Sequence, residues 1–221
     1  MNYSKQKYRE KKLPGQSNNN LVILIAICLV LFVGLAFIKA VWFYKYPKEV
    51  ALTLYYADVL TWLSFPADFS IFLSKPWTIL THMFVHDNVW KIFANMLWLW
   101  CFGYILQDIT GAKKTIPVFI YGSLGGALGF MLAYYLLPSL QAQLPFANNI
   151  GASAGVMAVA VVTTIISPGY RIFPLIGGGI PLWILTALYF ISSIAGISFT
   201  DTAYLISMLA AAFTGLLFIF F

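Results

Sequence analysis

One serine stands where a nucleophile could be exposed. The segment 148–157 reads Asn-Asn-Ile-Gly-Ala-Ser-Ala-Gly-Val-Met, so Ser153 has almost only small neighbours. Small neighbours let a substrate backbone approach a hydroxyl, and backbone amides at the start of a helix stabilise an oxyanion. Gly151 and Gly155 also form a GxxxG pair, which by itself predicts close helix packing. The pattern leaves two interpretations open, a catalytic serine and a packing residue.

A second polar group precedes and enters an apolar stretch near residue 90. His82 and His86 are the two histidines of the chain, and no Cys, Glu or third His lies beside them. Two ligands make a weak metal site, so we expect these histidines to brace a loop and expect no metal. Lys91 and Asn95 share one helix face. Such a lysine usually reaches the headgroups, and such an asparagine usually bonds to another helix.

The composition places these residues in a membrane. Apolar residues make up 61 % of the chain and charged residues 9 %, and the mean hydropathy is +0.85. A water-soluble globular surface and a disordered chain are both excluded by these values.

Six apolar runs are long enough to cross roughly 30 Å of hydrocarbon. They cover about 21–43, 89–107, 115–137, 150–167, 179–197 and 203–221. The fourth run is rich in small residues, which predicts a helix buried among its neighbours. The first loop, 44–88, is apolar but is interrupted by Pro66 and Pro76. We expect this loop to lie along the interface or dip into one leaflet.

Basic residues indicate the orientation in the membrane. Residues 1–20 form a basic, polar arm, and no small-x-small cleavage site follows the first apolar run, so that run should remain as an anchor. Eight basic residues fall on one predicted side and three on the other, which places both termini in the cytoplasm. The eight are Lys5, Lys7, Arg9, Lys11, Lys12, Lys113, Lys114 and Arg171, and the three are Lys45, Lys48 and Lys75. The arm is too short and irregular for a nucleic-acid surface, so no nucleic-acid partner is expected.

Over residues 21–221 these features, in this order, resemble the rhomboid family of intramembrane serine proteases. The resemblance rests on Trp77 and Thr-His-Met-Phe at 81–84 in the first loop, Asn-Met-Leu-Trp at 95–98, Gly-Ala-Ser at 151–153 and a small-residue sixth helix. With Met157 after the serine turn, the chain is most similar to the rhomboids of Bacteroidetes. The resemblance implies an all-α polytopic membrane protein, a six-helix bundle with a long membrane-associated first loop.

The family's site residues carry over position by position. In that family a fourth-helix serine is the nucleophile, a sixth-helix histidine is its base, and a second-helix histidine and asparagine hold the oxyanion. Ser153 matches the nucleophile and Asn95 the oxyanion asparagine. Lys91 stands in place of the oxyanion histidine, and Met208 stands in place of the base. Structural or gating positions by this resemblance are Gly151, Ala154, Gly155, Ala211, Gly215, Trp77, His82 and His86.

The departures from the family pattern weigh against catalysis. A serine hydroxyl is a weak nucleophile without an adjacent base, and a thioether is too weak an acceptor to serve as one. Losing the base of a serine hydrolase costs several powers of ten in rate. Ala154 also replaces the glycine that usually follows the serine. Ala211 and Gly215 still give the sixth helix a small-xxx-small face, which predicts packing against the fourth helix.

The sequence therefore favours a rhomboid-like pseudoprotease in a bacterial inner membrane. It would bind transmembrane segments of other membrane proteins without cleaving them and would need no cofactor; its partners are these segments and the lipid bilayer, and no oligomeric state is specified. The alternative is an active serine endopeptidase that uses Ser153 with Lys91 as an unconventional base, since a lysine in a low-dielectric site loses its charge easily. A channel or transporter is disfavoured, because no acid or base lies mid-span and matched interrupted helices are absent.

Overall fold

The computed structural model describes residues 20–172, 178–194 and 202–220 of the chain. Residues 1–19 of the predicted arm 1–20, and residues 195–201, lie outside the described residues. The helices are α1 (Asn20–Lys45), α2 (Lys48–Asp58), α3 (Phe69–Ser74), α4 (Thr78–Thr81), α5 (Val89–Thr110), α6 (Thr115–Leu136), α7 (Pro138–Gln141), α8 (Ser153–Ile166), α9 (Leu182–Ile194) and α10 (Thr202–Phe220). Single 3₁₀ turns lie at Leu60–Trp62 (η1), His82–Phe84 (η2) and Ala112–Lys114 (η3).

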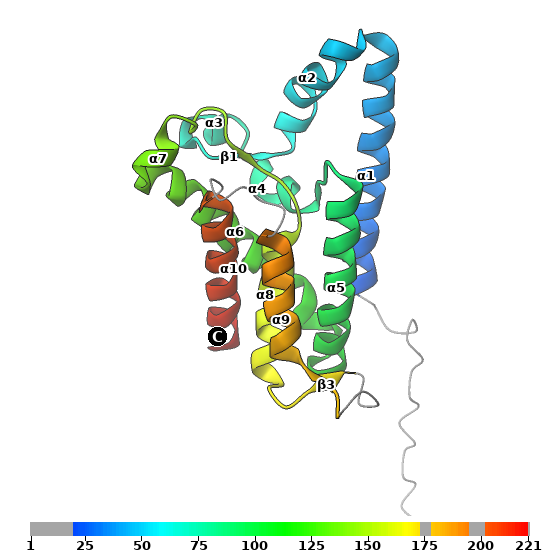
Figure 1. The fold of residues 1–221 in the computed structure, drawn as a ribbon, viewed down its shortest axis with the longest axis vertical. Coiled ribbons are helices and arrows are strands. Elements are labelled where there is room, and N and C mark those ends of the chain that lie inside the picture. Colours follow the sequence, from blue (N-terminus) through cyan, green and yellow to red (C-terminus); the bar gives the residue numbers. More distant parts are fainter. Residues whose placement is uncertain (1–19, 173–177, 195–201, 221) are drawn as a thin grey trace, which may run out of the picture.

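Two very short antiparallel sheets accompany these helices. Phe65–Pro66 (β1) pairs with Asn148–Asn149 (β2), and Arg171–Ile172 (β3) pairs with Ile180–Pro181 (β4). The first sheet ties the first loop to the segment before α8, at one end of the bundle. The second sheet lies at the opposite end, next to α9 (Figure 1). The described residues form an all-α polytopic membrane protein, as predicted.

Four of the described helices, α1, α5, α6 and α10, are long and apolar enough to cross a membrane. Helices α8 and α9 are apolar but shorter, with 14 and 13 residues. The predicted boundaries were wrong by a few residues at two of these starts. Helix α8 begins at Ser153 and not at residue 150, because Gly151 has a φ of +114°, outside the helical region. Helix α9 begins at Leu182 and not at residue 179, because β4 pairs with β3 just before it.

Helices α6, α8 and α10 pack against one another through small residues. A Cβ atom added to Gly122 of α6 would lie 2.1 Å from Ala158 Cβ of α8, and one added to Gly126 would lie 2.5 Å from Ala154 Cβ. Gly215 of α10 approaches Ala158 as closely as 3.0 Å on the same basis. Such distances leave no room for side chains, so backbone contacts backbone along this three-helix interface. On the other side of α8 lies α5, which packs against α1 (Figure 1).

The first loop, between α1 and α5, folds into α2, η1, β1, α3, α4 and η2 at one end of the molecule (Figure 1). Its outer surface is apolar: Phe69, Leu73 and Trp77 are all exposed. An exposed apolar surface on a membrane protein suits contact with lipid at the interface. The loop ends at Asn88, whose side-chain oxygen accepts hydrogen bonds from Trp90 N–H and Lys91 N–H and so caps α5.

Candidate functional site

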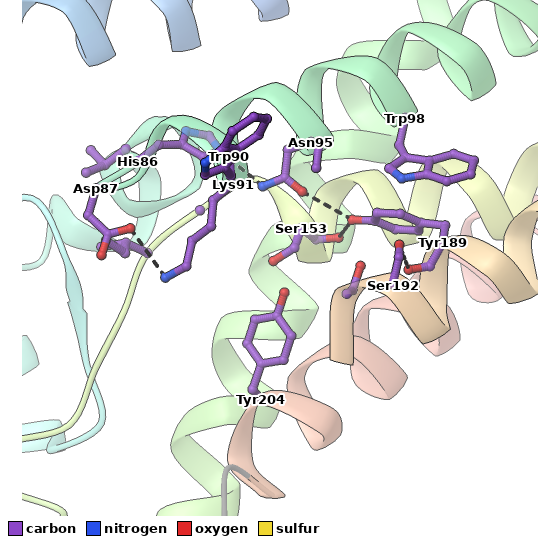
Figure 2. Close-up of a pocket in the computed structure, with 15 residues that line it drawn as sticks. His86, Asp87, Trp90, Lys91, Asn95, Trp98, Ser153, Tyr189, Ser192 and Tyr204 are labelled. Carbon is purple, nitrogen blue, oxygen red and sulfur yellow. Dashed lines mark hydrogen bonds and ion pairs between the residues drawn. The ribbon is translucent and has the colours of Figure 1, made fainter. Parts of the chain in front are cut away.

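A pocket of about 450 Å³ opens at the first-loop end of the bundle (Figure 2). Its walls are the end of the first loop, α5, the turn before α8, and the ends of α9 and α10. Five residues predicted from the sequence line this pocket: His86, Lys91, Asn95, Gly151 and Ser153. The other predicted residues, Met208, Trp77, His82, Ala154, Gly155, Ala211 and Gly215, are not among its lining residues.

Ser153 is the first residue of α8 and faces the pocket (Figure 2). Gly151 allows this placement, because its positive φ turns the chain sharply just before the helix. The Ser153 carbonyl accepts a hydrogen bond of 2.9 Å from the Tyr189 hydroxyl of α9. The Ser153 hydroxyl is thus held at the pocket wall by the Gly151 turn and by the bond from Tyr189 to the Ser153 carbonyl.

Asn95 joins three elements around Ser153. Its Nδ2 donates to His86 Nε2 at 3.1 Å, and its Oδ1 lies 3.5 Å from the Tyr189 hydroxyl. Figure 2 shows the Asn95 amide between these two rings and above Ser153. An amide nitrogen carries two protons, and His86 is its one partner among the described residues. The second proton is available to an oxygen that enters the pocket.

His86 acts here as an acceptor. Its Nδ1 lies 3.3 Å from the Phe84 carbonyl, which can only accept, so Nδ1 carries the proton and Nε2 the lone pair. Nε2 also receives the Ala152 N–H at 3.4 Å. Burial lowers the pKa of His86 to about 4, with the Phe84 carbonyl opposing this shift. The imidazole is therefore neutral near pH 7, and its lone pair is shared between two amides.

Lys91 lies at the edge of the pocket and pairs with an acid. Its Nζ is 3.3 Å from Asp87 Oδ1, one helical turn earlier, and its side chain is 66 % exposed (Figure 2). Tyr56 lies near Asp87, and the pKa of its phenol is raised by burial first and then by the Asp87 charge.

Met208 is 1 % exposed and lies in the main apolar core. The same core contains Met157 of α8 and Tyr189 of α9. A methionine at this position fills volume between helices, and its thioether offers only a weak acceptor.

The remaining first-loop residues brace the site from outside. His82 is buried, and its Nδ1 donates to the Thr78 carbonyl at 3.0 Å, while its own carbonyl accepts the Gly151 N–H at 2.9 Å. This last bond links the first loop directly to the serine turn. Trp77 stacks on Trp62 with ring centres 5.9 Å apart, and its indole N–H donates to the Trp62 carbonyl. Trp77 therefore shapes the first loop and not the pocket wall.

The predicted small residues belong to the helix interfaces. A Cβ atom on Gly155 would lie 2.4 Å from Ser123 Oγ and 2.7 Å from the Phe119 ring of α6. Ala154 meets Gly126, Gly215 meets Ala158, and Ala211 is fully buried in α10. These residues set the distances between α6, α8 and α10, and thereby the position of Ser153 at the end of α8.

Two residues that bond to the predicted site residues were not themselves predicted from the sequence. Asp87 precedes Lys91 by four residues, and this spacing of opposite charges is a recognised pairing signal. Tyr189 gives no comparable signal, because it lies 94 positions from Asn95 and 36 from Ser153. Among the described residues, no group of three or more His, Cys, Asp and Glu side chains could hold a metal ion.

The fold and the pocket define a helical membrane protein with a serine and an asparagine in the wall of one pocket. A family model of the rhomboid domain matches residues 73–221. The chain belongs to the rhomboid family.

Curated relatives give the same family over a shorter stretch. The chain is 30 % identical over 66 residues to the "Rhomboid protease GlpG" of Salmonella newport (strain SL254) and, equally, to that of Salmonella heidelberg (strain SL476). The match covers 30 % of this chain and 24 % of each relative, so the chain matches about a quarter of the length of these relatives.

Proposed function

We propose that this protein is a rhomboid-family pseudoprotease that binds transmembrane segments of other membrane proteins without cleaving them. The observation that supports this most directly is Met208, which stands in the apolar core where the family has its base. A pocket of about 450 Å³ is present and is lined by Ser153 and Asn95. A pocket with hydrogen-bonding groups but without a base suits binding better than acyl transfer.

Lys91 and His86 also line the pocket, but neither is a good substitute for the family's histidine base. The Lys91 ammonium is ion-paired with Asp87 and exposed, so it has no lone pair to accept a proton. The His86 imidazole is neutral and lines the same pocket as Ser153. Its Nε2 lone pair, however, already accepts hydrogen bonds from Asn95 Nδ2 and Ala152 N–H. Using His86 as a base would leave both amides without an acceptor, at a cost of about 1–3 kcal/mol for each buried group.

The pocket offers polar groups that a bound segment can pair with. Asn95 has one uncommitted amide proton, and Ser153 places a hydroxyl at the pocket wall. A fully hydrogen-bonded helix has no free backbone groups to offer, whereas a helix loosened by Gly or Pro exposes carbonyls and amides. We infer that the bound segments contain helix-breaking residues where they meet the pocket.

We further propose that the first-loop end of the bundle faces away from the cytoplasm of a bacterial inner membrane. The opposite end carries Lys113, Lys114 and Arg171 close to the helix ends, in keeping with the positive-inside bias. Bound segments would then meet the pocket in the outer leaflet.

The test is covalent labelling of the purified protein with a fluorophosphonate, which reacts with activated serines. We expect Ser153 to remain unlabelled, and Ser153→Ala to behave as the unaltered protein. Rapid stoichiometric labelling that Ser153→Ala abolishes would show an active enzyme and overturn the proposal. If that labelling rose with pH and also vanished in Lys91→Ala, the active-enzyme alternative with Lys91 as base would be correct.

A gain-of-function pair sharpens the same test. Replacing Lys91→His and Met208→His together returns both histidine positions of the family pattern. Cleavage of a transmembrane reporter by this double variant, and by neither single variant nor the unaltered protein, is the expected result if only the acid-base groups are missing. Cleavage by the unaltered protein would contradict the proposal.

A further inference from the structure

A second cavity of about 510 Å³ adjoins the pocket that contains Ser153. It lies between α2, η1 and the segment before α8, on the first-loop side of the molecule. The two cavities share three lining residues, Asp87, Lys91 and Ile150. The Asp87–Lys91 ion pair therefore stands at the junction, and any chain that fills both cavities must pass it.

The second cavity has the lining of a peptide site. Polar side chains from two directions reach it: Thr53, Thr61 and Ser64 from the first loop, and Asn148 from the segment before α8. An extended peptide needs partners for its backbone groups, and hydroxyl and amide side chains provide them. Leu60, Phe146 and Ile150 also line the cavity, so it offers both apolar contacts and hydrogen-bonding groups, as a peptide with mixed side chains requires. The cavity thus suits the polar flank of a membrane protein that leaves the bilayer beside the pocket.

At the junction of the two cavities, the positive charge of Lys91 is more exposed than the negative charge of Asp87. The Asp87 side chain is 20 % exposed, and its carboxylate is paired with Lys91. The Lys91 side chain is 66 % exposed, and Asp87 is its one ion-pair partner in the described part of the chain. An ammonium has three donors, so two remain for an incoming acceptor. A carboxylate is the peptide group that best matches such an ammonium.

We propose that Lys91 selects segments whose outer flank carries an Asp or Glu next to the membrane-spanning part. The transmembrane part would fill the pocket at Ser153, and the acidic flank would cross Lys91 into the second cavity. This inference rests on the proposed binding function and adds to it the kind of partner. It gives Lys91 a role as a specificity residue at the position where the family has a histidine.

The experiment compares capture of matched reporters by crosslinking from the second cavity, with the full-length protein in membranes. The reporters share one Gly-bearing transmembrane segment and differ only in a Glu, Gln or Lys placed at successive flank positions. We expect the Glu reporter to be captured about three to five times more than the Gln reporter, the size of a partly exposed ion pair, and the Lys reporter less than both. The preference should vanish in Lys91→Gln and reverse in Lys91→Glu.

Two control variants separate charge from folding. The exchange Asp87→Lys with Lys91→Glu keeps an ion pair in the same turn of helix but reverses its direction, so it should prefer the Lys reporter. Lys75→Gln removes another lysine of the first loop, one that lies over the Trp62 ring 4.7 Å from its centre and lines neither cavity. It should leave the Glu preference unchanged.

The outcomes distinguish this inference from the binding function beneath it. Equal capture of the three reporters would overturn the role of Lys91 and leave the binding function in place. A Glu preference that survives Lys91→Gln would also overturn it. Failure to capture any reporter would overturn the proposed binding function itself.

Discussion

Helix α8 passes through two regions that differ in what they require of a side chain. Along most of its length it packs against α6 and α10 through small residues, and the gaps there are filled. At its first-loop end, α8 places Ser153 in a pocket that is also lined by Asn95, His86 and Tyr189. The three-helix interface constrains side-chain volume, whereas the pocket brings polar groups together.

Packing between helices depends on side-chain volume, whereas proton transfer depends on one particular atom. A helix interface needs residues of suitable volume, and Met208 is buried in such a core. A general base needs a lone pair of the right strength at one particular atom. One change at such an atom removes catalysis, while the same change hardly affects packing. The scaffold and the reaction can therefore be lost independently.

The largest expected effect is on the three-helix interface. Gly122→Ala would place a Cβ atom 2.1 Å from Ala158 Cβ, so α6 and α8 must separate. We expect a loss of about 1–3 kcal/mol in stability, the usual cost of overpacking, and a clearly lower midpoint of thermal unfolding in detergent. The matched control is Gly34→Ala on the outer face of α1, where nothing lies within 4 Å of the added atom. Equal midpoints for the two variants would show that the interface is not tightly packed.

The next largest effect is a loss of stability at acid pH, caused by the two buried histidines beside the serine turn. Burial lowers the pKa of His82 and His86 to about 4, below the usual 6.5, so the unfolded chain binds more protons than the folded one between these values. Stability should therefore be full above about pH 6.5 and fall as the pH drops toward 4. We expect the unfolding midpoint to decrease by roughly 5–10 °C over this range.

The control for this pH effect is a chain without the two titrating rings. In His82→Asn with His86→Gln the midpoint is expected to be lower at pH 7, because contacts are lost, but nearly constant between pH 6.5 and 4. Gln at position 86 keeps an acceptor for Asn95 and Ala152. A slope as steep as in the unaltered protein would assign the pH dependence to other groups.

Much of the fold follows from the sequence because apolar length is a direct signal. The apolar runs locate α1, α5, α6 and α10 to within a few residues, since each must match the hydrocarbon thickness. The start of α8 was misplaced, because hydropathy does not register the positive φ of Gly151. The same is true of α9, whose start depends on pairing between β3 and β4. Backbone geometry and pairing override apolar length at these two positions.

The site was predictable where residues lie on one helix face and not where they meet across the fold. Lys91 and Asn95 line the pocket together, as their spacing of four indicates. The contact between His86 and Asn95 crosses the cap at Asn88, where helical periodicity does not apply. Tyr189 reaches Ser153 only through the packing of α9 on α8. No local pattern encodes either contact.

A smaller effect is expected for the polar wall of the pocket. Asn95→Leu keeps a similar volume but removes the amide proton available to a bound segment, so capture of a Gly- or Pro-bearing segment should fall about three- to tenfold. A poly-Leu segment has no free backbone groups and should be captured weakly by both proteins. Crosslinking yields measure capture, and the unfolding midpoint confirms that the variant is folded. Equal yields for the two segments with the unaltered protein would remove the basis for this preference.

The smallest expected effect comes from removing a hydrogen bond between α8, which belongs to the three-helix interface, and α9, which forms part of the pocket wall. Thr164 of α8 and Thr186 of α9 share a hydrogen bond of 2.7 Å between their hydroxyls, the one side-chain to side-chain bond between these helices among the described residues. Bonds of this kind in membranes average about 0.6 kcal/mol, so Thr186→Val should barely change the unfolding midpoint. Hydrogen exchange of the α9 amides is the sensitive measurement, and we expect it to quicken by about threefold or less.

The control is Thr110→Val, which removes only bonds to nearby backbone carbonyls at the end of α5 and should leave exchange in α9 unchanged. Unchanged exchange in Thr186→Val would mean that α9 is held by its apolar face alone, and the pocket wall would then depend on the same kind of packing as the three-helix interface.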